Sequence, residues 1–148
     1  MLFRSERVKN WNSLYGARGF LQYQLVVPSA KGIKEILLAV SNSNDCSYLT
    51  VLKKFGESNQ NLLSFPQDGY TLTMDFKRTR SIFSLLDKLD EIVLNLGGRL
   101  YCAKDARMSK KVFQSSYPRW QEFIDIKTQV DPTHRFKSLQ SQRLGLSR

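Results

Sequence analysis

An apolar stripe over residues 82 to 96 constrains the fold of this chain more than any other feature of its sequence. Its members recur with a period of about 3.6 residues, which predicts one face of an amphipathic helix. They are Ile82, Leu85, Leu86, Leu89, Ile92, Val93 and Leu96. Gly97 and Gly98 follow as a helix end, and residues 99 to 103 have the pattern of a short strand. We therefore expect a helix that passes through a tight turn into a strand.

Three more strands and one more helix precede this unit. Residues 20 to 27, 46 to 55 and 70 to 76 are rich in β-forming residues or alternate between polar and apolar ones, as strands do. Ser29 is a suitable N-cap for a helix that continues to Val40. The order βαββαβ predicts an α+β fold, a ferredoxin-like antiparallel sheet with both helices on one face.

The end of the chain is expected to be a C-terminal helical extension. Residues 108 to 113 and 118 to 126 have helical patterns, and the chain from Asp131 onward is interpreted as an irregular arm. The last 45 residues, roughly, hold too few apolar positions for a core of their own, so they must pack on something else. They are also basic, because residues 99 to 148 carry 11 Lys and Arg against 4 Asp and Glu in a chain of formal charge +10.

Composition and charge limit the classes of protein to consider. A basic surface attracts nucleic acid, anionic lipid or a phosphorylated substrate, and a solvated basic face is the plain alternative. No apolar run approaches the roughly 20 residues that span a bilayer, and Met1 to Ser5 begins no apolar signal core. We expect a cytoplasmic or peripherally membrane-associated protein. Cys46 and Cys102 are interpreted as buried structural thiols, and the single histidine, His134, leaves no metal site to propose.

Lys104 and Tyr101 are the first candidates for chemistry, because they emerge where the last predicted strand ends. A lysine in that place can hold positive charge against a developing anion, and a neighbouring tyrosine can donate a hydrogen bond. The same local pattern also fits a surface charge followed by Asp105 as the cap of the next helix.

A second group of candidates lies on the faces of the predicted strands. Side chains repeat every second residue along a strand, so Gln22 and Gln24 share one face, as do Thr71 and Thr73. Lys53 ends the second strand. We predict that these five side chains form a polar platform on the sheet face opposite the helices. The alternative for the two glutamines is an ordinary solvent-facing strand.

Several short segments occur in one order along nearly the whole chain. They are Trp11-Asn12, residues 15–24 (Tyr-Gly-Ala-Arg-Gly-Phe-Leu-Gln-Tyr-Gln), Lys53-Lys54-Phe55-Gly56, Leu63-Ser64-Phe65-Pro66, Met74-Asp75-Phe76, residues 97–105 (Gly-Gly-Arg-Leu-Tyr-Cys-Ala-Lys-Asp), Tyr117-Pro118-Arg119, Val130-Asp131-Pro132 and Arg135-Phe136. Together they resemble the FAD-dependent sugar oxidases of the vanillyl-alcohol oxidase type and, within them, the decaprenylphosphoryl-ribose 2-oxidases.

This resemblance implies an FAD-dependent oxidoreductase that oxidises a secondary alcohol of a sugar by hydride transfer to the flavin. The implied substrate is a polyprenylphosphoryl pentose of cell-envelope biosynthesis. Residues 1 to 98 would form the second half of the substrate-binding (cap) domain, and residues 99 to 148 the segment that returns to the FAD-binding domain. The FAD-binding domain is absent, so the chain looks truncated. We expect it to be inactive alone, to hold no FAD tightly, and to need the FAD-binding or N-terminal portion as its partner.

The resemblance also assigns roles to residues. Lys104 and Tyr101 would be catalytic and cofactor-binding, with Lys104 near the pyrimidine edge of the flavin, where it would stabilise the reduced form. The substrate pocket would be lined by Gln22, Gln24, Lys53, Thr71 and Thr73. The two threonines depart from the asparagine and cysteine usual in the mycobacterial members, which leaves the sugar open.

Three other readings of the sequence are kept. One is a relative of the sugar-lactone oxidases, and another is a degenerate partner that completes a flavoenzyme made of two chains. The third is a non-catalytic ferredoxin-like module that binds RNA or a protein partner. The strands lack the aromatic-rich signature of RNA-binding sheets, so no nucleic acid partner is expected.

Overall fold

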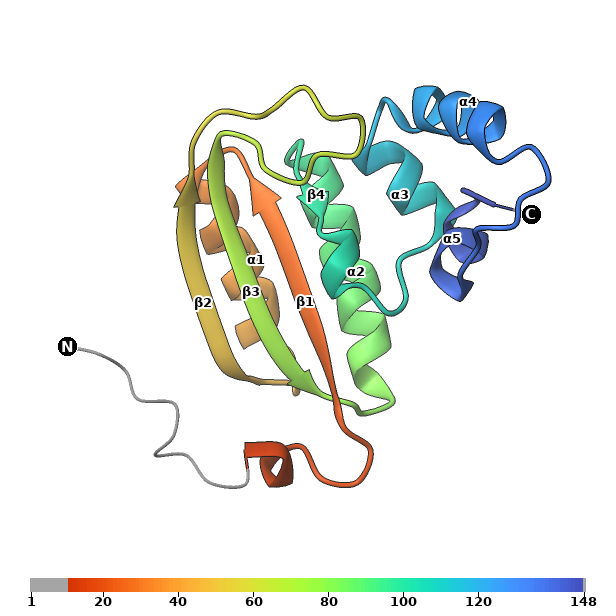
Figure 1. The fold of residues 1–148 in the computed structure, drawn as a ribbon. Helices are drawn as coiled ribbons and strands as arrows, with labels where there is room; N and C mark the ends of the chain where they lie inside the picture. The colour runs from red at the N-terminus through yellow and green to blue at the C-terminus, as the bar shows by residue number, and fades with distance from the viewer. Residues whose placement is uncertain (1–10, 148) are drawn as a thin grey trace.

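Four antiparallel strands form one sheet in the order β2-β3-β1-β4 (Figure 1). The computed structural model describes residues 11–147; the start of the chain discussed above lies outside this range. The strands are β1 (Phe20–Val27), β2 (Ser47–Phe55), β3 (Gly69–Lys77) and β4 (Arg99–Leu100). This order, with two helical crossovers, is the predicted ferredoxin-like α+β arrangement, which is confirmed.

Both crossover helices cover the same face of the sheet. Helices α1 (Ala30–Ser41) and α2 (Ser81–Asn95) lie behind the strands in Figure 1. The Ser29 side chain accepts a hydrogen bond from the Gly32 N–H and so caps α1 as expected. Alternate strand residues pack against the helices and form the core with the α2 stripe. The strand members are Tyr23, Leu25, Val27, Leu72, Met74 and Phe76.

The double glycine after α2 has a separate reason at each position. Gly97 has a φ of 69°, in the left-handed region that a side chain disfavours. A Cβ at Gly98 would lie 2.3 Å from the Val26 carbonyl oxygen, so only glycine lets the chain enter β4 beside β1. This turn fixes where the chain emerges after Leu100, and hence where Lys104 lies.

The C-terminal extension shares the core of the sheet domain. It comprises α3 (Lys110–Ser116), α4 (Trp120–Val130) and α5 (Leu139–Leu144), beside α2 and β4 in Figure 1. Four of its residues are buried in the main apolar cluster: Met108, Phe113, Tyr117 and Leu144. The prediction of an irregular arm from Asp131 onward is wrong for residues 139–144, which form helix α5. A capping box between Ser138 and Ser141 starts this short helix, and Leu144 anchors it.

Three local expectations are corrected by the structure. The last strand ends at Leu100, and Cys102–Lys104 forms a single 3-10 turn, η3, because the Lys104 N–H bonds back to the Tyr101 carbonyl. Asp105 does not cap α3, whose N-cap is Ser109. The two thiols are not both buried, since Cys46 is exposed just before β2 and Cys102 is half-buried. Within residues 11–147 no helix is long and apolar enough to cross a membrane.

Candidate functional site

The strand register brings the predicted polar residues onto the sheet face that carries no helix, here called the open face. In β1 and β3, Gln22 pairs with Asp75 and Gln24 pairs with Thr73. In β2 and β3, Lys53 pairs with Thr71. Cross-strand partners point to the same side of a sheet, and the core residues of β1 and β3 have the other parity. The predicted common face of the five residues is confirmed.

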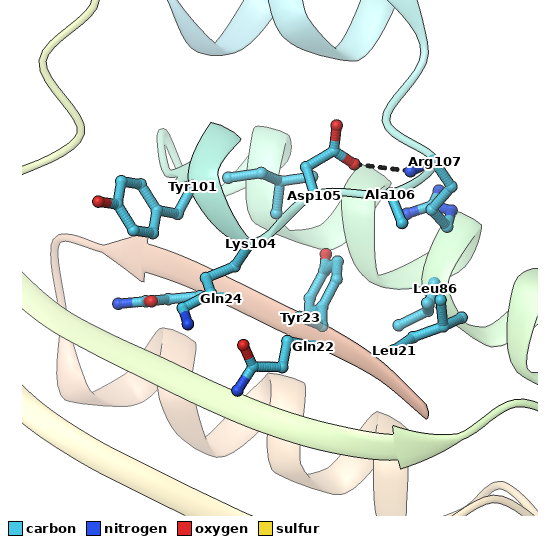
Figure 2. Close-up of a pocket in the computed structure, with 11 residues that line it drawn as sticks. Leu21, Gln22, Tyr23, Gln24, Leu86, Tyr101, Lys104, Asp105, Ala106 and Arg107 are labelled. Carbon is cyan, nitrogen blue, oxygen red and sulfur yellow. Dashed lines mark hydrogen bonds between the residues drawn. The ribbon is translucent and has the colours of Figure 1, made fainter. Parts of the chain in front are cut away.

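A groove of about 240 Å³ crosses the open face. It is lined by Gln22, Gln24, Leu49, Val51, Lys53, Thr73, Asp75 and Lys104. Figure 2 shows Lys104 reaching from the turn after β4 over β1 toward Gln24. Lys53 and Lys104 are both exposed, and neither ammonium group forms a hydrogen bond or an ion pair with residues 11–147. The groove therefore presents two available cations beside amide and hydroxyl groups.

Thr71 lies on the open face but outside the lining of this groove. Its side chain is almost fully buried; the hydroxyl donates to the Leu25 carbonyl at 2.8 Å and accepts from the Gln24 amide at 3.1 Å. Both hydrogen-bonding roles of the hydroxyl are thus used within the protein. Thr71 fixes the rotamer of Gln24, whereas Thr73, two residues on, lines the groove itself.

Tyr101 is held at the end of the open face by an aromatic cluster and by the backbone. Its ring stacks on Phe65 with centroids 4.4 Å apart, and Phe65 meets Phe55 edge-on at 5.8 Å. The Tyr101 N–H donates to the Gln24 carbonyl at 2.9 Å. The crevice that Tyr101 and Lys104 share with Tyr23, drawn in Figure 2, has room for only about 10 Å³, too little for a ligand.

Asp75 is the functional candidate that the sequence reasoning missed. It is 3% exposed, it lines the groove, and its Oδ1 has no hydrogen-bond partner in the part of the chain that the structure describes. The signal was available, because Asp75 has the same strand parity as Thr71 and Thr73. Among the groove-lining residues it is the one acidic group, so it gives a largely donor-lined surface one strong acceptor.

A buried polar network lies on the helix side of β1, between β1, α2 and the residues that follow Lys104. The Tyr23 hydroxyl donates to Asp90 at 2.8 Å, and Arg107 donates to both oxygens of Asp90, at 3.2 and 2.6 Å. Burial raises the pKa of Asp90, although the hydrogen bonds and charge of Arg107 oppose this. Burial, with the Asp90 charge, also raises the pKa of Tyr23 well above its ordinary value. Arg107 thus joins the segment after Lys104 to α2.

The chemistry open to this groove is the binding of an anionic or hydroxyl-rich ligand. Two ammonium groups and two amides supply donors, and ammonium groups bind phosphate and carboxylate well. No group of three or more His, Cys, Asp or Glu side chains suited to a metal occurs in residues 11–147. This finding concerns residues 11–147 only, and the expectation that the chain has no metal site stays a prediction.

The fold and the groove define a ferredoxin-like α+β domain with a polar, open sheet face and an attached helical extension. Residues 33–144 match the family described as D-arabinono-1,4-lactone oxidase, and the chain belongs to this family. It is 43% identical over 138 residues to a protein named decaprenylphosphoryl-beta-D-ribose oxidase from Mycolicibacterium smegmatis, covering 92% of this chain and 30% of that protein.

A second relative comes from Streptomyces coelicolor. It is called an uncharacterized protein in the mprA 5' region, and it is 32% identical over 115 residues, which cover 77% of this chain and 31% of that protein. The chain therefore spans about a third of the length of the curated relatives that it matches. The resemblance to the sugar oxidases, stated above on short segments, is confirmed.

Proposed function

We propose that this chain is the substrate-side and C-terminal portion of an FAD-linked oxidase that oxidises a secondary alcohol of a sugar. Residues 1 to 98 form the second half of its substrate-binding domain, and residues 99 to 148 form the segment that returns to the FAD-binding domain. The observation that carries the proposal is the groove. Lys104 meets Gln22, Gln24, Lys53 and Thr73 there, although these residues come from four separate segments.

In this proposal the groove binds the sugar. Gln22, Gln24 and Thr73 hydrogen-bond the hydroxyl groups of the substrate, and Lys53 attracts its anionic part. Thr71 contributes by fixing Gln24. The substrate class that suits a cationic, hydroxyl-binding groove is a phosphorylated pentose, with a polyprenylphosphoryl pentose as the leading candidate. An aldonolactone, by the family's description, is the second candidate.

Lys104 and Tyr101 are the proposed catalytic and cofactor-facing residues. FAD, when bound, supplies the hydride acceptor of the reaction. The donor set of this chain fits one part of that group: Lys104 offers an available cation and Tyr101 a phenol at the rim of the open face, as an electron-rich ring edge would require. The described residues offer no glycine-rich loop for the pyrophosphate, so the proposed role is limited to the ring.

The C-terminal extension supports the second partner in this proposal, the FAD-binding domain. Large apolar side chains in and after α4 are exposed: Val130 by 77%, Phe136 by 80% and Leu139 by 87%. Such a concentration of exposed apolar side chains is typical of an interaction surface. About 70% of the length of the first relative lies outside the match, so the rest of the enzyme is the natural occupant. This partner lies on the same chain or on a separate one.

The experiment is reconstitution. This chain is co-expressed with the part of the M. smegmatis relative that precedes the matched region, FAD is added, and a decaprenylphosphoryl pentose is mixed in without oxygen. We expect loss of the oxidised-flavin absorbance at a rate that Lys104→Ala lowers by about 10²- to 10³-fold, as removal of one charge-stabilising group does. Arabinono-1,4-lactone is tested in parallel to separate the two substrate classes.

Lys88→Ala is the matched control, since Lys88 is an exposed lysine of α2 outside the groove. It should leave the rate unchanged. A wild-type complex that holds FAD yet is reduced by neither substrate would contradict the proposed function. A Lys104→Ala complex as fast as wild type would remove Lys104 from the chemistry.

A further inference from the structure

Helix α5 contacts the segment that carries Lys104, 35 to 38 residues away along the chain. That segment, residues 101–108, is called the Lys104 turn. It is anchored to β1 through the Tyr101 N–H and to α2 through Arg107. Between these two anchors Ala103 and Lys104 are exposed. A single 3-10 turn so placed needs further support to hold one conformation.

Two residues of α5 supply that support. The Gln140 amide donates to the Cys102 carbonyl at 2.6 Å. The Arg143 guanidinium bonds Asp105 Oδ2 at 2.8 Å with one nitrogen and the Met108 carbonyl with the other. Asp105 in turn accepts from the N–H groups of Arg107 and Met108 through Oδ1. Both oxygens of the carboxylate are therefore engaged, and the backbone is held on both sides of Lys104.

The sequence of α5 explains why these contacts converge. Gln140, Arg143 and Leu144 are spaced i, i+3 and i+4, so they share one face of the helix. Leu144 on that face is 2% exposed in the core, whereas Leu139, one turn before Arg143, is 87% exposed. A six-residue helix has little stability alone. Here the capping box and the buried Leu144 stabilise it, so the backbone of Arg143 is held in place.

We propose that Gln140 and Arg143 are positioning residues for the oxidation, acting through the Lys104 turn. The inference rests on the proposed function because it takes Lys104 as the site lysine. Asp105 has only 7% of its side chain exposed and Arg143 has 30%, so this ion pair is shielded from water. It links α5 to Asp105, the residue next to the lysine expected to face the substrate.

The consequence is a link between docking and the site. The side of α5 that carries Leu139 belongs to the exposed apolar surface assigned above to the FAD-binding domain. Arg143, one turn after Leu139, and Gln140, the residue next to it, hold the Lys104 turn in place. Seating of the C-terminal segment on its partner therefore sets the position of Lys104.

The first test measures backbone amide hydrogen exchange of the full chain by NMR. Arg143→Gln removes the charge and both guanidinium contacts. We expect the Lys104 and Met108 amides to exchange at least about tenfold faster, while the Val93 amide in α2 keeps its rate, as in local opening. Arg135→Gln is the matched control, because Arg135 is exposed and its side chain forms no hydrogen bond or ion pair with a described residue. Unchanged exchange at Lys104 in Arg143→Gln would overturn the proposal.

The second test uses the reconstituted enzyme. Arg143→Gln should lower kcat by about tenfold or more with a smaller change in KM, since misplacement of a reacting group by about 1 Å costs up to about 10²-fold. Arg143→Lys keeps the charge beside Asp105 and should recover part of kcat. A kcat equal to wild type in Arg143→Gln, despite faster exchange, would show a purely structural contact and overturn the proposal.

Gln140→Leu is a second variant, used in case Arg143→Gln unfolds the whole domain. It removes the single bond to the Cys102 carbonyl and leaves both Arg143 contacts intact. Faster exchange at Lys104 but not at Val93 in this variant supports the proposal even if Arg143→Gln unfolds, and unchanged exchange overturns the role of Gln140. A wild-type complex that reduces no flavin would sink the proposed function, while the exchange data would still decide whether α5 holds the turn.

Discussion

Replacement of Arg107 by methionine should destabilise this domain by about 3–5 kcal/mol at neutral pH, as loss of one partner of a buried ion pair does. Asp90 has 2% of its side chain exposed, and Arg107 has 14%. Without the guanidinium, Asp90 keeps one donor, the Tyr23 hydroxyl. Asp87, the other partner of Arg107, is 70% exposed. Loss of the Arg107–Asp87 ion pair therefore adds only about 0–1 kcal/mol to the destabilisation. The cost is therefore mostly the unpaired charge of Asp90.

The same reasoning gives the dependence on pH. Burial already raises the pKa of Asp90, and Arg107 opposes this, so methionine at position 107 raises that pKa further. A carboxyl group with a raised pKa in the folded state destabilises the fold when it is ionised. This penalty is absent below the unfolded pKa of about 3.9 and grows as pH rises through the folded pKa. The loss in Arg107→Met should therefore be at least about 1 kcal/mol smaller at pH 5 than at pH 7.5.

Urea denaturation followed by circular dichroism at the two pH values measures both quantities. Arg107→Met combined with Asp90→Asn should recover more than half of the loss at pH 7.5, because a neutral amide replaces the unpaired carboxylate. A loss below about 1 kcal/mol, equal losses at both pH values, or no recovery in the double variant would refute the account of Asp90 as a buried charge held by Arg107.

Three further outcomes test other parts of the structure. Thr71→Val should cost about 1–3 kcal/mol in urea denaturation, because the Leu25 carbonyl and the Gln24 amide lose their partner; Thr73→Val is the control and should cost less. For Asp131, burial alone would raise the pKa, yet Lys127 and the N–H groups of Arg135 and Phe136 hold it below the ordinary value. Asp131→Asn should therefore lower the Tm at pH 7, and the difference should disappear as pH falls through the folded pKa; a constant difference would contradict this. Iodoacetamide should modify exposed Cys46 well before Cys102, whose pKa is raised by burial; mass spectrometry that finds Cys102 modified first would contradict this.

The parts of the site that the sequence predicted are those that depend on strand periodicity. Gln22, Gln24, Thr71 and Thr73 could be placed on one face because side chains alternate along a strand whatever the tertiary contacts. The α2 stripe and the double glycine then fixed the fold class and the emergence of Lys104. Whether a residue of that face is free or engaged could not be predicted. Thr71 was assigned to the pocket, yet its hydroxyl is fully used by Leu25 and Gln24.

What could not be predicted depends on contacts between distant segments. The last predicted strand was too long because the chain turns after Leu100, where the Lys104 N–H bonds to the Tyr101 carbonyl, and Arg143, 38 positions from Asp105, holds the residues that follow. Helix and strand propensities over a short window of sequence do not include contacts between residues so far apart. Helix α5 was missed because its six residues include only one buried leucine, Leu144, which gives no periodic signal.

The polar groups of the site are of two kinds: those held by hydrogen bonds within the protein, and those with unengaged side chains. The first kind suits recognition of a ligand, and the second suits the proposed chemistry. Gln24 is fixed twice, through Thr71 by its side chain and through Tyr101 by its carbonyl. Lys53 and Lys104 have fixed backbones but unengaged ammonium groups. A rigid amide discriminates hydroxyl geometry, whereas a free ammonium on a flexible stem adapts to an anion. Because only the backbone of Lys104 is held by the ion pairs of Arg107 and Arg143, its side chain stays free to meet a group that arrives from outside this chain. The proposed role of Lys104, facing a cofactor held by another part of the enzyme, requires such a side chain.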